Sequence, residues 1–249
     1  MSLQPTLLRF DSIDSTNLEA MRQARSGAPE GLCVVAREQT AGRGRLDRKW
    51  HSPKDAGLYF SVVLRPQFEL GAWPLITLMA ALATVDALNA ACRLRADIKW
   101  PNDICVDERK LCGILAETVE TVAGPAAILG IGINLSPLGP AEFASRATSI
   151  QEVTNKNPNA EQILSALTER LGQRYDLLAT KEGREHIIRE WCANSSYAFD
   201  REVRVSTANA SFNGVTRGLD NDGALRVETP DGKVMAVRAG EVTAVRPAL

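Results

Sequence analysis

The chain has 249 residues, of which 45% are hydrophobic and 24% are charged, an ordinary composition for a globular protein. Its net charge of −1 gives no general attraction for nucleic acid or for an anionic membrane, so any cationic site must be local. The five cysteines form no Cys-x-x-Cys pair and there are only two histidines, which argues against a disulfide framework and against a zinc site. No signal peptide is predicted, so we expect a cytoplasmic protein with reduced thiols.

Helix and strand signals alternate along the first 198 residues. Four segments have the capping or apolar pattern of helices: 16–25, 73–91, 161–178 and 184–192. Four apolar runs have the composition of strands: 32–36, 57–64, 110–119 and 126–135. The last two strands are joined by a Gly124-Pro125 turn and are apolar enough for the centre of a sheet. Residues 139–159 are rich in Pro, Ser and Asn and are expected to be mostly loop.

The pattern changes near Phe199. Short runs with strand character follow at 203–205, 214–218, 224–227 and 233–237. Turns rich in Asp and Gly, at 220–223 and 230–232, separate them. Strands this short with such turns predict a small antiparallel barrel. We therefore divide the chain into a domain over 1–198 and a barrel domain over 199–249.

The segment GRGRLDRKW, residues 42–50, places four cations within nine residues. Glycine lets the backbone approach a ligand closely, and arginine offers forked donors that suit carboxylates and phosphates. A solvated basic loop, or one that touches nucleic acid, explains the segment equally well. Because no Walker pattern and no G-x-G-x-x-G pattern occurs, a nucleotide phosphate would have to be held by another architecture.

Other motifs place polar residues or glycines where ligands commonly bind. Asp14-Ser15-Thr16-Asn17 lies at a helix start, where it can hold a polar ligand group or simply cap the helix. Lys99-Trp100-Pro101-Asn102-Asp103 surrounds a turn, and its Asn/Asp pair suits Mg²⁺ as well as a plain Asx turn. Lys110 begins an apolar strand, facing an anionic ligand or snorkelling to solvent. Gly130 and Gly132 interrupt a strand, for close approach of a ligand or for helix packing.

Together and in this order, these motifs resemble those of the biotin protein ligase family, the biotin–[acetyl-CoA-carboxylase] ligases. The resemblance runs from about Ser12 to Leu135, and the terminal barrel matches the family's small C-terminal domain. It implies an α+β fold: a mixed β-sheet flanked by helices, related to class II aminoacyl-tRNA synthetases, with a C-terminal SH3-like β-barrel. It also implies that biotin and ATP, with Mg²⁺, form biotinyl-5′-AMP and pyrophosphate. Biotin then passes to a specific lysine of a biotin carboxyl carrier protein.

The resemblance also implies roles for individual residues, with 42–50 as the loop that closes over biotin and the adenylate. The implied catalytic residues are Lys110, Arg45, Arg48 and Asp103. The implied biotin-binding residues are Ser15, Thr16, Gln39, Gly42, Arg43, Lys110, Gly113, Gly130 and Gly132. The implied ATP- or adenylate-binding residues are Arg43, Arg45, Arg48, Trp50, Asn102, Lys110 and Asn134. Mg²⁺ is expected mainly through the ATP phosphates, with its protein ligands unknown.

This chain departs from the family pattern Gly-Arg-Gly-Arg-Arg-Gly-Arg at Leu46 and Asp47, which changes the shape and charge expected of the loop. Because about 13 residues precede Asp14, we expect the monofunctional type, without an N-terminal DNA-binding domain and without DNA or membrane binding. The sequence leaves monomer and homodimer open. Two other functions remain: a lipoate or octanoate ligase-like acyltransferase of the same fold, and a nucleic-acid-binding protein that uses the arginine loop. GRGR, KWPND and the barrel favour biotin, and the net charge counts against nucleic acid.

Overall fold

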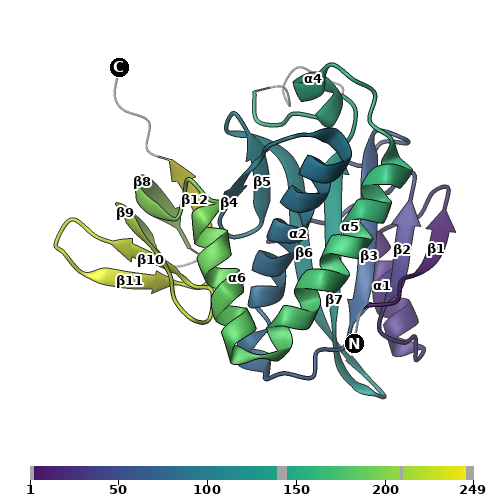
Figure 1. Cartoon of the computed structure of the whole chain (residues 1–249), viewed down its shortest axis with the longest axis horizontal. Coiled ribbons are helices and arrows are strands. Elements are labelled where there is room, and N and C mark those ends of the chain that lie inside the picture. The colour runs from purple at the N-terminus through teal and green to yellow at the C-terminus, as the bar shows by residue number, and fades with distance from the viewer. Residues whose placement is uncertain (1–2, 139–144, 208–209, 245–249) are drawn as a thin grey trace.

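The structure, a computed structural model, describes residues 3–138, 145–207 and 210–244 (Figure 1). Its larger sheet has seven strands, which in spatial order are β1 (Thr6–Phe10), β2 (Leu32–Ala36), β3 (Gly57–Leu64), β7 (Gly124–Asn134), β6 (Arg109–Thr121), β5 (Asp103–Val106) and β4 (Asp97–Lys99). β1 and β2 run parallel, and every other neighbouring pair in this sheet is antiparallel. The predicted mixed sheet is therefore confirmed.

Helices cover both faces of this sheet. The helices α2 (Leu75–Cys92), α5 (Ala160–Tyr175) and α6 (Lys181–Ala193) pack together over one face, and α1 (Thr16–Arg25) covers the other (Figure 1). By length and composition α2 could cross a membrane, with a mean hydropathy of 1.7, but it lies against β6 and α5 as a core helix. Part of the expected loop forms the short helix α4 (Ile150–Thr154), and residues 139–144 lie outside the described residues.

β7 occupies the centre of the sheet because it is apolar on both faces. Leu129, Ile131 and Ile133 point to the large core that includes α2 and α5. On the opposite face, Ala126 and Ile128 pack into a second core beneath α1. Further along that second face the side chains stop at glycines, and the sheet surface is left open beside the start of α1.

A second sheet of five antiparallel strands follows, beginning at Phe199, where we propose the domain boundary. In spatial order its strands are β11 (Val234–Val237), β10 (Leu225–Glu228), β9 (Ser211–Leu219), β8 (Phe199–Ser206) and β12 (Glu241–Ala244). Within the described residues no ladder joins β11 to β12, so the closed barrel stays a prediction. The sheet is fastened to the larger one where the buried Trp100 indole donates to the Gly223 carbonyl at 3.1 Å.

The main differences from the sequence prediction lie at short or exposed elements. β1, β4, β5 and β12 were not expected, because strands of three to five residues leave too little periodicity to detect. The sequence pattern Thr16-x-x-Glu19 predicts a capping box at the start of this helix, and that prediction is wrong. Ser15 is the N-cap, and the Thr16 hydroxyl instead donates to Gln39. The side chain that resembled a local cap is used for a contact 23 residues away.

The bond between Trp100 and Gly223 generates a stability prediction. Trp100→Phe removes the donor and leaves a buried carbonyl unpaired, so unfolding should become easier by about 1–3 kcal/mol in urea titrations. Amide exchange in β9 and β10 should also accelerate, since this bond fastens their sheet. Trp73→Phe is the matched control, because it removes a similar bond to the Phe68 carbonyl, 3.2 Å away, in another part of the chain. Equal exchange in β9 and β10 for both variants would contradict the assignment.

Candidate active site

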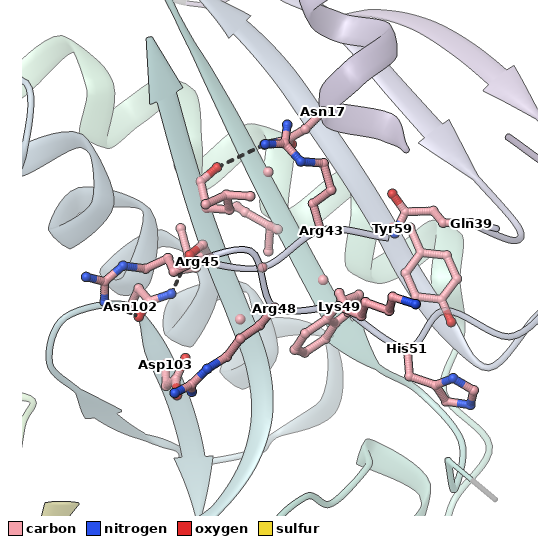
Figure 2. A pocket seen from close by; sticks show the side chains of 18 of the residues that line it. Asn17, Gln39, Arg43, Arg45, Arg48, Lys49, His51, Tyr59, Asn102 and Asp103 are labelled. Carbon is pink, nitrogen blue, oxygen red and sulfur yellow. Dashed lines mark hydrogen bonds between the residues drawn. The ribbon is translucent and has the colours of Figure 1, made fainter. Parts of the chain in front are cut away.

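A cavity of about 290 Å³ lies between the open face of β6 and β7 and the loop that carries the cations (Figure 2). It gathers residues from α1, β3, β5, β6, β7, β12 and the loop. Every residue predicted for the site lines this cavity except Gly42. Gly42 lies behind the wall instead: a Cβ there would stand 2.4 Å from the Trp50 carbonyl oxygen and 2.6 Å from Ser52 Oγ. It therefore lets the two sides of the loop approach each other.

Three glycines form the floor of the cavity. Gly113 on β6 lies opposite Gly132 on β7, and Gly130 precedes it on the same face. The Trp50 indole rests on this floor: a Cβ at Gly132 would lie 2.5 Å from its Nε1, and one at Gly113 would lie 2.9 Å from its Cζ3. The Lys110 Nζ stands 5.2 Å from the centre of the same ring. The floor therefore accepts a flat ring against the sheet backbone.

One end of the cavity is a hydrogen-bonded cluster at the start of α1. The Thr16 N–H and hydroxyl both donate to Gln39 Oε1, at 2.8 and 3.1 Å. The Gln39 amide then donates to Ser52 Oγ at 2.8 Å, and the Ser61 hydroxyl lies within hydrogen-bond distance of both Thr16 and Asn17. This end presents hydroxyl and amide groups beside the helix N-terminus, which suits a small polar ring.

The loop itself is a hairpin. Its strands are joined by Trp50 N–H donating to the Gly42 carbonyl at 2.9 Å and Gly44 N–H donating to the Arg48 carbonyl at 2.7 Å. Leu46 and Asp47 form its tip with φ values of 54° and 57°, the left-handed geometry of a type I′ turn. The two residues that depart from the family pattern therefore occupy positions that favour glycine or asparagine, and the Leu46 side chain is exposed.

Five lysines and arginines line the cavity, and four of them, Arg43, Arg45, Arg48 and Lys110, each contact a different acceptor. Arg43 pairs with Glu117 at 2.9 Å, Lys110 with Asp103 at 2.6 Å, and Arg48 with Glu241 of β12. Arg45 donates to Asn102 Oδ1 at 3.2 Å and to the Gly240 carbonyl at 3.4 Å.

Figure 2 shows Arg45 and Arg48 directed toward Asn102 and Asp103, whereas Arg43 points toward Asn17. The hydrogen bond that Arg48 donates to Glu241 raises the pKa of Arg48, and burial lowers the pKa of Arg45 from its ordinary value. Both arginines remain charged near neutral pH, because a guanidinium does not deprotonate in proteins. Together with Lys110, which pairs with Asp103, three cations thus converge at one end of the cavity.

The described residues contain no group of three or more His, Cys, Asp or Glu side chains that could hold a metal ion by themselves. Asp103 lines the cavity as a carboxylate beside the converging cations. This donor set fits Mg²⁺ that arrives on phosphate oxygens, since Mg²⁺ typically takes one or two protein carboxylates together with substrate phosphates.

Several residues of the cavity were missed by sequence reasoning. Asn17 belonged to a quoted motif but received no role, although it lines the cavity and is only 4% exposed. Tyr59 and Leu115 resembled ordinary strand residues, and the alternation along their strands could have shown that they share a face with the glycines. Glu241 had no local signal, because it belongs to the second sheet and reaches the cavity only in the fold.

Two parts of the chain match known protein families. Residues 9–134 match the Biotin/lipoate A/B protein ligase family, and residues 198–243 match the Biotin protein ligase C terminal domain. The chain belongs to this family. The resemblance to biotin protein ligases drawn from the motifs is confirmed, and with it the α+β fold class and the assignment as a ligase enzyme.

Relatives span most of the chain. It is 37% identical over 232 residues to the bifunctional ligase/repressor BirA of Bacillus spizizenii, covering 91% of this chain and 70% of that protein. It is 35% identical to the biotin–[acetyl-CoA-carboxylase] ligase of Paracoccus denitrificans, covering 92% of this chain and 96% of that one. The solved structure of the Aquifex aeolicus biotin protein ligase in complex with biotin and ATP matches with a TM-score of 0.84 at 29% identity, over 96% of this chain and 99% of that chain.

The close contact between Gly130 and Asn17 predicts that a side chain at position 130 weakens ligand binding. In Gly130→Ala the new methyl group would lie 2.1 Å from Asn17 Oδ1, which is itself buried. Asn17 must move and the polar end of the cavity with it, so ligand affinity should fall at least about tenfold, as expected when a buried polar group loses its partners. Calorimetric titration with biotin measures this. Gly71→Ala is the control, since no atom lies within 4 Å of its Cβ position. Wild-type affinity in Gly130→Ala would show that Asn17 has no part in the site.

Proposed function

We propose that this chain is a biotin protein ligase that activates biotin with ATP and transfers it to a lysine of a biotin carboxyl carrier protein. The observation that carries the proposal is the order of features along the cavity. A polar cluster at α1 is followed by three converging cations, and a glycine floor with an aromatic ring lies beside them. This order suits a ligand that has a polar ring at one end, anionic groups in the middle and a flat base beside them. The free state of all five cysteines fits a cytoplasmic enzyme.

Biotin would bind at the polar end. Its ureido ring needs fixed donors and acceptors, which Ser15, Thr16 and Gln39 present at the start of α1. The apolar wall supplied by Leu115 suits the rest of the bicyclic ring. In this orientation the valerate chain extends from the polar end and brings its carboxylate to Arg45, Arg48 and Lys110.

The adenine of ATP would lie against the Trp50 indole, which covers the glycine floor at Gly113 and Gly132. Asn134 supports this, because its amide N–H₂ donates to the Thr148 carbonyl at 2.9 Å and this bond sets the orientation of the amide. Its Oδ1 is buried and has no hydrogen-bond partner among the described residues. A buried acceptor in this state is stabilised by a donor such as an amino group of a base, and Trp50 provides a stacking surface.

The chemistry requires two anions to meet. A biotin carboxylate oxygen attacks the α-phosphorus of ATP, the new P–O bond forms, and the bond to the β-phosphate oxygen breaks to release pyrophosphate. Arg45, Arg48 and Lys110 offset the repulsion and stabilise the charge that accumulates in the transition state. Mg²⁺ carried by the phosphates, beside Asp103, supplies further neutralisation.

The carrier lysine then attacks the carbonyl carbon of the mixed anhydride, and AMP leaves. This amine must lose a proton, and Asp103, a carboxylate that lines the cavity beside Lys110, would accept it. The hairpin over the cavity shields the anhydride from water until the lysine arrives.

The direct test supplies ATP, Mg²⁺, labelled biotin and a carrier domain to the purified chain. Label should appear on the carrier lysine only when ATP is present. Labelled lipoate in place of biotin should give no product. Transfer of lipoate with biotin inert would favour the acyltransferase of the same fold and overturn the proposal.

A variant of Lys110 tests the charge argument. Lys110→Ala should slow biotinyl-AMP formation on the order of a hundredfold, because loss of one preorganised donor in a transition state typically has that effect. Folding should change little, since the Lys110 side chain is a third exposed. Lys54→Ala is the matched control, as it breaks a 2.5 Å pair with Asp11 at the surface. Equal rates in Lys110→Ala and the wild type would remove Lys110 from the mechanism.

A further inference from the structure

We propose that Glu117 is a positioning residue of the biotin site, holding Arg43 and Asn17 with one carboxylate, and that the Arg43 side chain is a structural strut and not a ligand for the anionic junction. The inference rests on the proposed function and concerns residues to which the family resemblance gave a different role or none. A carboxylate so close to a site for two anions is unexpected, because it would repel both substrates unless its charge is fully used. The contacts around Glu117 show how it is used.

The Glu117 carboxylate accepts hydrogen bonds from two partners. The Arg43 guanidinium contacts both of its oxygens, at 2.9 and 3.2 Å, and the Asn17 amide N–H₂ donates to one of them at 2.9 Å. Arg43 comes from the hairpin and Asn17 from the first turn of α1, so a single side chain on β6 joins the two parts of the site. Glu117 itself does not line the cavity, and its side chain is only 21% exposed.

Glu117 also helps to determine which way the Asn17 amide faces, together with the Leu115 carbonyl, which accepts from the same amide nitrogen at 3.3 Å. Because the carboxylate accepts from the amide nitrogen, Asn17 Oδ1 turns toward Ser61, whose hydroxyl is 2.6 Å away, and toward Gly130. From Ser61 the bonds continue through Thr16 and Gln39 to Ser52, which donates to the Trp50 carbonyl at 3.1 Å.

The hairpin is therefore anchored at both ends by one chain of polar contacts. The chain of contacts starts at Arg43, runs along the polar end of the cavity, and returns to the loop at Ser52 and Trp50. The groups that would recognise the ureido ring, Thr16 and Gln39, lie in the middle of this chain. Loosening Arg43 should consequently disturb ligand recognition as well as closure of the loop, since hydrogen-bonded networks act cooperatively.

The direction of the Arg43 side chain separates it from the other cations. Figure 2 shows it pointing toward Asn17, while Arg45 and Arg48 point toward Asn102 and Asp103 at the other end. The two possible roles of Arg43 predict opposite effects of a Glu117 substitution on ligand affinity. If Arg43 bound the anion, Glu117 would compete with it, and neutralising Glu117 would tighten binding. If Arg43 is a strut, the same change loosens the loop and weakens binding.

The experiment compares Glu117→Gln, Arg43→Met and the double variant with the wild type. Each protein is loaded with biotinyl-AMP, and the release rate is measured. Glu117→Gln and Arg43→Met should each release it about tenfold faster, the effect of losing one charge-assisted hydrogen bond. The double variant should be no worse than the worse single variant, because both remove the same interaction. In Glu117→Gln, adenylate formation in a single turnover at saturating substrates should stay within about twofold of the wild type, since Glu117 does not line the cavity and touches no reacting atom.

A second measurement needs no ligand. Trypsin cleaves after Arg45, Arg48 and Lys49 when the hairpin opens, so the initial rate of cleavage there reports on the anchor directly. Glu117→Gln and Arg43→Met should raise it about tenfold, in line with the lost charge-assisted bond. Arg43→Met alters only a loop side chain and serves if Glu117→Gln folds poorly. Glu228→Gln, which breaks a 2.6 Å pair with Arg217 in the second sheet, is the matched control and should change neither rate.

Three results would each contradict the structural role of Arg43. They are slower or unchanged adenylate release in Glu117→Gln, unchanged cleavage of the ligand-free hairpin, and additive losses in the double variant. A wild-type chain that makes no adenylate would instead overturn the proposed function, and trypsin cleavage would still decide the role of Glu117.

Discussion

The site depends on the absence of side chains at Gly113, Gly130 and Gly132, on one face of the central ladder of the sheet. Glycine within a strand destabilises it by roughly 0.5–1 kcal/mol relative to alanine, so three of them weaken the most central pair of strands. The opposite face offsets this, because Leu129, Ile131 and Ile133 are fully or almost fully buried. The strand therefore divides its two faces between stability and binding. The same residues that make β7 central allow it to carry an open floor.

Charge is the second constraint on the site. Arginines and a lysine placed around an anion-binding cavity repel one another, and the fold relieves this repulsion with Glu117, Asp103 and Glu241. The acids come from three different strands, so the cationic loop is stabilised only when the whole fold is assembled. An incoming carboxylate or phosphate competes with Asp103 and Glu241, whereas Glu117 lies outside the cavity and is not displaced. A bound anion can therefore replace Asp103 and Glu241 as partners of Lys110 and Arg48. It does not reach Glu117, which keeps its pair with Arg43.

Much of the site could be predicted because its chemistry sits in short local motifs. The glycines, the arginine loop, Lys110 and the start of α1 all stood out from the sequence, and the structure brings them to one cavity. Glu117 could not be predicted, since one acidic residue on a strand has no signal until the hairpin lies over it. The prediction that Gly42 lines the cavity was wrong for a related reason. The sequence indicates that position 42 needs a glycine, but it does not show which atom comes close to that glycine. In this case the atom belongs to Trp50, on the other side of the same hairpin.

The second sheet explains why a small C-terminal unit accompanies the site. It reaches the loop twice, through the Gly240 carbonyl to Arg45 and through Glu241 to Arg48, and it reaches the Lys99–Asp103 turn through Gly223 and Trp100. These are the segments that carry the converging cations and Asp103. A hairpin with non-glycine residues at a type I′ tip is under backbone strain, and such conformations persist only when surrounding contacts over-determine them. Gly240 and Glu241 supply contacts on both sides of that tip, so the geometry of the cationic junction is a property of the two sheets together and not of the larger sheet alone.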